Sequence, residues 1–239
     1  MLVAAGVCPH PPLIVPELAG AAASELDDLR AACAEVIRSL VECDPDLLVV
    51  VGPAERSADY PGDAAGTMRP WGADVRAGRG EPVLPLSLTV GRWLLDRYAP
   101  DPDALPALRL EAVAADAAPA GCAALGEEIA RSAGRVAILA MGDGSARLTE
   151  KSPGYLHPGA VPYNDMIGRA IAAGEAGLLA GLDPAEADEL WVGGRVAFQV
   201  LAAAAAEAAG RCASGSLYDD APYGVGYFVA RWTFEPTPS

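Results

Sequence analysis

The sequence predicts a single α/β domain in which a mostly parallel central sheet is flanked by helices on both faces. Residues 2–7 form a short apolar run ended by Pro9, and residues 47–51 form another between Asp-Pro-Asp and Gly-Pro, as is typical of buried strands. Between them, residues 24–42 carry apolar side chains at i, i+3 and i+4 spacing, which predicts a helix capped by Ser24. This strand–helix–strand order is typical of a parallel sheet covered by helices.

The remaining chain continues the alternation of strands and helices. The clearest further buried strand is residues 135–141, RVAILAM. Other strands are predicted at 108–115, 216–220 and 225–234, and helices at 87–98, 121–133, 162–173, 175–180, from Asp183 onward, and after Gly193-Gly194 to Ala209. Residues 53–82 are rich in Gly, Pro and Ala, which predicts a long loop or lid. Because no repeat or linker divides the chain, we expect residues 1–239 to form one domain.

Composition and charge exclude several classes of protein. Hydrophobic residues make up 52% of the 239 residues, which excludes a disordered chain. The 17 Lys and Arg against 32 Asp and Glu give a net charge of −15, so neither nucleic acid nor an anionic membrane is expected as a partner. The five cysteines lack a CxxC spacing, which predicts a reduced, cytoplasmic protein without a structural zinc site. The two histidines exclude a metal site built on three imidazoles.

Polar side chains follow several of the predicted strands. In open α/β sheets, ligands bind in the crevice outside the carboxyl ends of the strands. We therefore expect a pocket formed by the residues at these ends, namely His10, Pro11, Glu55, Asp143, Ser145 and Asp219.

Each of these residues also has a structural interpretation. Histidine suits proton transfer at neutral pH, but His10 between prolines also fits a rigid strand end. The Gly-Asp-Gly-Ser segment at 142–145 could bind an anion, although a tight turn is the favoured interpretation. Glu55 beside Arg56 fits a solvated surface pair better than a metal ligand, and Cys8 is expected to be a small buried hydrophobe.

Four segments together resemble a known family. They are the strand running into Pro-His10-Pro-Pro, the Val-Val-Val-Gly-Pro strand end, the strand followed by Asp143-Gly144-Ser145, and the terminal YDDAPYGVGYFVA. They resemble the class III extradiol ring-cleavage dioxygenases of the B-subunit type, whose superfamily includes the MEMO-like proteins and the plant DOPA dioxygenases. The likeness covers nearly the whole chain and is greatest to an uncharacterised actinobacterial branch. It implies a fold like that of the extradiol dioxygenase B-subunit.

The resemblance also implies a set of site residues. Active members of the family hold Fe(II) with two histidines and a third ligand, usually a carboxylate, and use a further histidine as acid and base. The resemblance places the first metal histidine at His10 and the second at Ala54 or Glu55. It places the acid/base histidine at Ala146 and the third ligand, a cysteine in the MEMO-like branch, at Gly193. Only His10 and Glu55 therefore remain as candidate metal ligands, in a site that is degenerate.

Loss of these residues changes the expected function. A facial triad needs three protein ligands, and catechol deprotonation needs a base. We therefore expect a protein without a cofactor that binds a small molecule near His10 and does not cleave rings with iron. A metal-dependent dioxygenase with an altered ligand set remains an alternative, using Fe(II) or another divalent metal on a catechol-like aromatic. So does metal-independent acid/base or hydrolytic chemistry, with His10 and Asp143 as candidate catalytic residues. Because enzymes on this fold often self-associate, a homo-oligomer is a further candidate partner.

Overall fold

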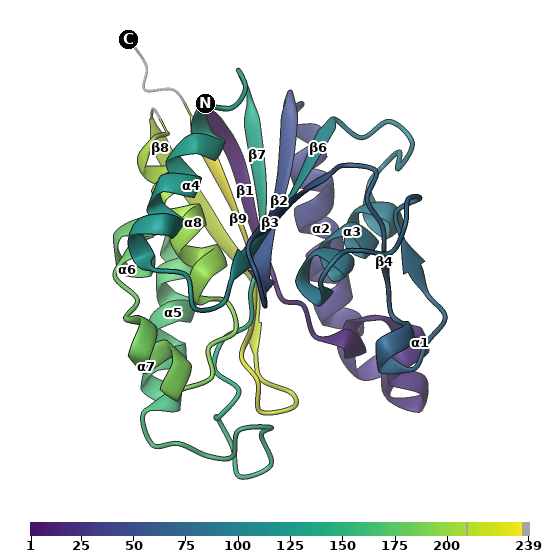
Figure 1. The fold of residues 1–239 in the computed structure, drawn as a ribbon. Coiled ribbons are helices and arrows are strands. Elements are labelled where there is room, and N and C mark those ends of the chain that lie inside the picture. The colour runs from purple at the N-terminus through teal and green to yellow at the C-terminus, as the bar shows by residue number, and fades with distance from the viewer. Residues whose placement is uncertain (209, 236–239) are drawn as a thin grey trace.

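A mixed seven-stranded sheet forms the centre of the protein (Figure 1). The computed structural model describes residues 1–208 and 210–235. The sheet has the order β3-β6-β2-β7-β1-β9-β8. Its four middle strands are parallel, and they are β6 (Ala107–Ala114), β2 (Leu47–Ala54), β7 (Val136–Met141) and β1 (Leu2–Cys8). The outer strands β3 (Ala58–Pro61) and β9 (Tyr227–Glu235) run antiparallel to their inner neighbours, and β8 (Arg211–Asp220) pairs antiparallel with β9.

Helices cover both faces of this sheet, as the apolar runs predict. In Figure 1 the sheet is seen nearly edge-on between two helical layers. One layer contains α2 (Asp27–Glu42) and α3 (Leu86–Tyr98), and the other contains α4 (Pro119–Arg131), α5 (Ala160–Ala173) and α8 (Arg195–Ala206). Alternate side chains of β2 enter different cores: Leu48 and Val50 pack toward α2 and α3, while Val49 and Val51 pack toward α4 and α8. Burial on both sides explains why β2 and β7 are apolar without alternation.

Shorter elements complete the chain. The helices among them are α1 (Pro16–Ala19), α6 (Ala176–Ala180) and α7 (Pro184–Glu189), with 3-10 turns at Pro12–Ile14, Gly20–Leu26 and Arg69–Trp71. The predicted cap of α7 is confirmed, because Asp183 Oδ1 accepts the amides of Ala185 and Glu186, both at 2.9 Å. Within the described ranges, no helix is long and apolar enough to cross a bilayer.

The structure corrects two of the expected helix ends. Ser24 is not the cap of a helix, because it lies within the 3-10 turn Gly20–Leu26, and α2 begins only at Asp27. No side chain caps α2. Its first turn instead carries Asp27 and Asp28, whose negative charges interact favourably with the positive end of the helix dipole. The helix expected to run to Ala209 is α8, which ends at Ala206, and residue 209 itself lies outside the described residues.

Residues 53–82 contain paired backbone where the composition suggested a loop. The strand β2 continues through Pro53 to Ala54, and β3 then adds to the open edge of β6. Further along, β4 (Gly66–Thr67) and β5 (Arg76–Ala77) pair as a small antiparallel ribbon. These pieces are too short to carry a hydrophobic period, which is why the sequence does not reveal them.

Candidate functional site

The carboxyl ends of β1 and β7 bring His10 and Asp143 together. The two strands are neighbours with Cys8 opposite Met141, and the amide of Gly142 donates to the carbonyl of Cys8 at 2.9 Å. Two residues beyond these ends, the backbone N–H of His10 donates to Asp143 Oδ1 at 2.8 Å. The ring atom Nδ1 of His10 lies 3.7 Å from the same oxygen. The parallel pairing thus places two predicted site residues side by side.

The imidazole of His10 is nearly enclosed. Its side chain is 12% exposed and that of Asp143 is 16% exposed. Its Nδ1 is buried and has no hydrogen-bond partner among the residues described. The remaining exposure of the side chain therefore belongs to other atoms, so the ring has one buried nitrogen facing Asp143 and an edge that reaches solvent. A histidine nitrogen without a partner is costly to bury, which makes this position unusual for a purely structural residue.

The segment after β7 is irregular backbone that is hydrogen-bonded to the segment before β9. The amide of Gly144 donates to the carbonyl of Gly226 at 2.7 Å, and that of Gly226 donates to the carbonyl of Ser145 at 3.0 Å. The amide of Ser145 donates to Asn164 Oδ1 at 3.1 Å. The amides of Gly144 and Ser145 are therefore engaged within the protein and are not offered to an anion. The tight turn expected here is wrong, because residues 142–144 have no turn assignment and neither Gly142 nor Gly144 has a positive φ. The fully buried Ser145 hydroxyl donates to the carbonyl of Leu190, so its oxygen faces the α7 end and not a ligand.

The other predicted pocket residues are Pro11, Glu55 and Asp219. Pro11 is buried next to it in sequence, and its carbonyl accepts the amide of Ile14 in a 3-10 turn. Glu55 lies exposed in the bend after β2, and no hydrogen bond or ion pair joins it to His10 in the described structure. Asp219 lies on β8 against α5, where burial and then the neighbouring Asp165 raise its pKa. The structure therefore joins His10 and Asp143, whereas among the described residues no hydrogen bond or ion pair joins Asp219 to either of them.

A hollow beside Asp143 was not predicted from the sequence. It has a volume of about 340 Å³, and residues from the end of β6, from α7 and from the start of α8 line it, among them Ala115, Asp188, Trp191, Gly193 and Arg195. Gly193 also lies against Asp143, since a Cβ at Gly193 would be 3.6 Å from the Cβ of Asp143. Gly193 is therefore a neighbour of both the hollow and Asp143, although neither Asp143 nor His10 is among the residues that line the hollow.

Two large side chains of this hollow, Arg195 and Trp191, differ in how they are held. The buried guanidinium of Arg195 donates to the carbonyls of Ala115 at 2.6 Å and Ala117 at 2.9 Å, so it braces the loop after β6. Trp191, by contrast, is 53% exposed and has a left-handed backbone with φ of 52°. Its only sequence signal is an aromatic residue shortly before Gly193-Gly194, which is too common a pattern to predict a pocket.

Burial dominates the titration of nearby groups. Burial first, and then the charge of Asp143, raises the pKa of Tyr227 on β9. Burial likewise raises the pKa of Cys8, which lies against Cys33 in the core, so its neutral thiol form is favoured. His157, the second histidine, lies elsewhere: its Nε2 is 3.3 Å from Glu189 Oε1.

The donor set around His10 does not fit a three-ligand iron site. The facial arrangement needs three protein ligands, and His10 and Asp143 supply two donor groups. Across residues 1–208 and 210–235, no group of three or more His, Cys, Asp or Glu side chains is arranged to hold a metal ion. Gly193 and Ala146, at two of the positions where the resemblance implies functional side chains, have no donor atoms in their side chains.

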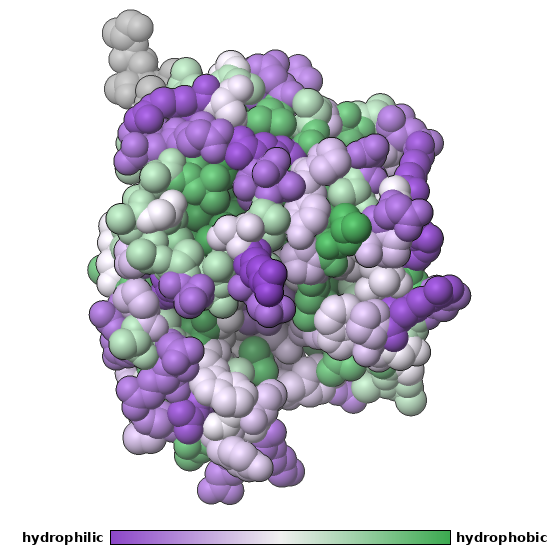
Figure 2. Space-filling model, in the orientation of Figure 1, coloured by the Kyte–Doolittle hydropathy of each residue, from purple (hydrophilic) through white to green (hydrophobic). Residues whose placement is uncertain are grey.

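The face of the protein drawn in Figure 2 is mixed in hydropathy. Figure 2 shows hydrophilic residues over much of one face, with apolar residues in scattered patches between them. Exposed apolar residues scattered in this way are normal for a folded protein and do not by themselves mark an interface.

Comparison with known proteins identifies a structural relative. No family model matches the chain, and no curated protein matches it. Its fold resembles the crystal structure of an uncharacterised protein from Escherichia coli K12, with a TM-score of 0.54 and 14% sequence identity. The likeness covers 97% of this chain and 99% of the other. At this identity the comparison concerns the fold alone, and it shows that the α/β architecture extends over the whole of both chains.

Proposed function

We propose that this chain is a small-molecule-binding protein built on a scaffold like that of the B-subunit-type extradiol dioxygenases. Its ligand is held at the carboxyl edge of the sheet, beside His10 and Asp143 and next to the hollow that contains Trp191. The observation that carries the proposal is the buried, unpartnered Nδ1 of His10 at 3.7 Å from the Asp143 carboxylate. A ligand that moves the His10 ring and the Asp143 carboxylate into hydrogen-bonding distance would give Nδ1 of His10 a partner.

The chemistry of the crevice favours a ligand with hydrogen-bond donors. Asp143 offers a carboxylate acceptor, and the exposed edge of His10 offers either a donor or an acceptor, depending on its tautomer. The exposed face of Trp191 offers a surface for a planar or apolar group. Hydroxylated aromatic compounds combine both features, so a panel of catechols is the appropriate first probe.

Binding is tested on the metal-free protein by isothermal titration calorimetry with the catechol panel. We expect binding by the wild type, and at least a tenfold loss in His10→Gln and in Asp143→Asn. The matched control is His157→Gln, which removes the other histidine and should leave binding unchanged. Equal affinity in the wild type and His10→Gln, or the absence of any binding from the panel, would contradict the proposal.

The His10–Asp143 pair also favours a second function, metal-independent acid/base chemistry. A carboxylate beside one ring nitrogen orients an imidazole, which leaves the other nitrogen to exchange a proton with a bound ligand. Turnover of a bound compound that is lost in His10→Gln, while the thermal unfolding transition is retained, would establish this activity. Binding of the compound by the wild type without turnover would support the binding function and contradict the catalytic one.

The metal-dependent alternative is tested separately. The protein is dialysed, analysed for Fe, Zn and Cu, and then reconstituted anaerobically with Fe(II) before O₂ and a catechol are added. Our proposal predicts no stoichiometric metal, no O₂ uptake and no yellow ring-opened product. Stoichiometric metal that His10→Ala releases, or ring opening in the reconstituted protein, would overturn it in favour of a dioxygenase with an altered ligand set.

A further inference from the structure

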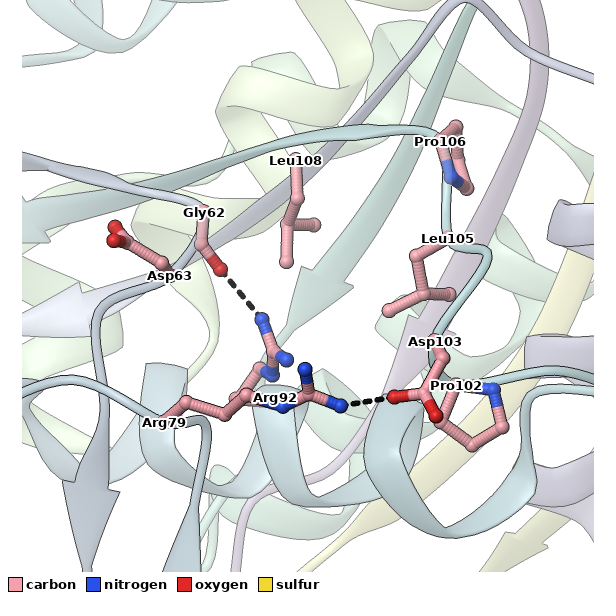
Figure 3. Close-up of a pocket in the computed structure, with 9 residues that line it drawn as sticks. All are labelled: Gly62, Asp63, Arg79, Arg92, Pro102, Asp103, Leu105, Pro106 and Leu108. Atoms are coloured by element: carbon pink, nitrogen blue, oxygen red, sulfur yellow. Dashed lines mark hydrogen bonds and ion pairs between the residues drawn. The ribbon is translucent and has the colours of Figure 1, made fainter.

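A second hollow lies beside the β3–β6 edge of the sheet, at the end where β6 begins. It has a volume of about 290 Å³. Its lining comes from the segment after β3, from α3, and from the loop that leads into β6. Figure 3 shows its lining, with Gly62 just after β3 and Leu108 at the start of β6, and with Arg79 and Arg92 below them in this view. Because parallel strands begin here, this hollow is distinct from the crevice at their carboxyl ends.

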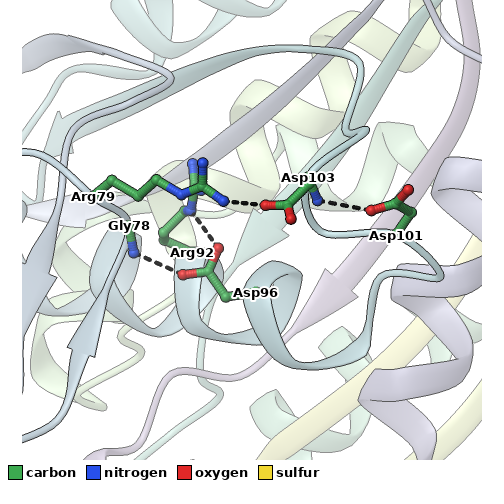
Figure 4. Close-up of polar contacts among 6 residues, drawn as sticks. All are labelled: Gly78, Arg79, Arg92, Asp96, Asp101 and Asp103. Atoms are coloured by element: carbon green, nitrogen blue, oxygen red, sulfur yellow. Dashed lines mark hydrogen bonds and ion pairs between the residues drawn. The ribbon is translucent and has the colours of Figure 1, made fainter.

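Two guanidinium groups enter this hollow. Arg92, on α3, is only 8% exposed, and it uses Nε to bind Asp96 Oδ1 at 2.8 Å and Nη1 to bind the carbonyl of Gly62. In the described part of the chain, its Nη2 has no hydrogen-bond partner. Arg79 comes from the loop after β5, and Figures 3 and 4 both show its guanidinium close to that of Arg92. Two cations in one hollow are unexpected in a chain of net charge −15.

The two arginines are held with very different strength. Asp96 is fixed, because its Oδ2 accepts the amide of Gly78 at 2.7 Å while its other oxygen accepts from Arg92 (Figure 4). Arg79 binds only Asp103 in the described structure, and the two side chains are 79% and 75% exposed. An ion pair so exposed contributes little free energy, because water screens it and both side chains lose conformational freedom. Asp103 is therefore easily displaced from Arg79.

We propose that this hollow binds a small organic anion that takes the place of Asp103 on Arg79. Its carboxylate or phosphate oxygens accept from Arg79 and from the free Nη2 of Arg92, an arrangement that suits the planar guanidinium group. Its apolar part contacts Leu105 and Leu108, which form the opposite wall of the hollow (Figure 3). The overall negative charge repels anions from the rest of the surface, so binding here depends on these two arginines.

The test is calorimetric titration of the wild type at low salt with phenyl phosphate and with benzoate, and with benzyl alcohol as the neutral probe. We expect one or both anions to bind and the alcohol not to bind. Arg79→Gln should weaken binding at least tenfold, whereas Asp103→Asn should strengthen it severalfold, because the competing carboxylate is lost. The better of the two anions identifies the head group.

A matched control is available in the same segment. Arg69 pairs with Asp74 at 2.7 Å, equally at the surface, but does not line the hollow, so Arg69→Gln should leave binding unchanged. His10→Gln should also bind the anion normally, which separates this site from the proposed crevice. The proposal is overturned if neither anion binds the wild type and Asp103→Asn, or if Arg79→Gln and Arg69→Gln weaken binding equally.

Discussion

At the scale of single residues, Ser145 shows how a predicted pocket residue is used by the fold. Its hydroxyl donates to the carbonyl of Leu190 at 2.5 Å and accepts the amide of Arg147 at 3.2 Å, and the residue is fully buried. These bonds join the loop after β7 to the segment after α7. Because both partners lie within the protein, removal of the hydroxyl affects the fold and not a ligand.

We predict that Ser145→Ala lowers the free energy of unfolding by about 1–3 kcal/mol, because it leaves buried polar partners unsatisfied. Urea denaturation monitored by circular dichroism measures the change. Catechol binding by the folded variant should remain close to that of the wild type. A variant of unchanged stability that loses binding would place the hydroxyl in the pocket instead.

The five cysteines provide a second prediction at this scale. Cys8, Cys33 and Cys122 are buried, whereas Cys43 and Cys212 are partly exposed, and all five are free thiols. Burial raises the pKa of both Cys43 and Cys212, so even these two should react slowly. In Ellman titration of the native protein we expect at most two thiols to react, and all five in guanidinium chloride. More than two rapidly reacting thiols in the native protein would contradict the described core.

Some of the candidate site follows from local sequence and some does not. His10 and Asp143 each follow a strongly apolar strand, and two such strands in a parallel sheet end at the same edge, so their proximity could be predicted. Asp219 could not be placed in this way, because whether it faces the crevice or α5 depends on the bulge in β8 between Ser216 and Tyr218. A shift of one residue moves a strand side chain to the opposite face.

At the scale of elements, two glycines of α4 test the packing of helix against helix. A Cβ at Gly126 would lie 2.3 Å from the carbonyl oxygen of Val200 on α8, which means that the two helices touch through backbone atoms here. A Cβ at Gly121 would meet no heavy atom within 4 Å. The two positions lie in the same helix and differ only in what surrounds them.

Gly126→Ala should therefore destabilise the protein by about 1–3 kcal/mol, because the backbone of α8 has to move to admit the methyl group. Gly121→Ala should be neutral or stabilise by up to about 1 kcal/mol, because alanine favours a helix. Thermal unfolding of the two variants and the wild type gives the comparison. Equal changes in both variants would show that α4 and α8 do not approach as closely as described.

Elements with a long hydrophobic period are the ones that the sequence predicts well. The helix α2 and the strand β7 both match the expected type, because sixteen and six residues respectively carry a consistent pattern. The strand β3 escapes prediction, because its four residues Ala-Asp-Tyr-Pro have no pattern of their own. It exists because the outer edge of β6 offers unpaired backbone groups, which is a tertiary cause.

At the scale of the whole molecule, the alternation of buried strands and helices determines the architecture, but not its hollows. The hollow beside Arg79 and Arg92 is formed by segments around residues 62, 79, 92 and 105, each ordinary when taken alone. The hollow beside Asp143 likewise joins the end of β6 to α7 and α8. Such sites depend on the relative placement of segments distant in sequence, which hydrophobic patterns do not encode.

The tyrosines give the whole molecule a defined response to alkaline pH. Burial is the main cause that raises the pKa of five of them, which are Tyr98, Tyr163, Tyr218, Tyr223 and Tyr227. For Tyr163, on α5, burial and the nearby Glu186 and Asp183 raise the pKa to about 12. In an unfolded chain, a tyrosine titrates near about pH 10. Between these values the folded protein therefore holds more protons than the unfolded chain.

It follows that the free energy of unfolding falls as the pH rises above about 10, by up to about 1.4 kcal/mol per pH unit for each extra proton held by the folded state. Urea denaturation at intervals between about pH 8 and pH 11.5 measures the slope. Tyr163→Phe removes one of these protons and should therefore make the fall shallower. If the slope of Tyr163→Phe equals that of the wild type, burial of the Tyr163 hydroxyl is not what opposes its ionisation, and the packing of α5 against α7 would need a different description.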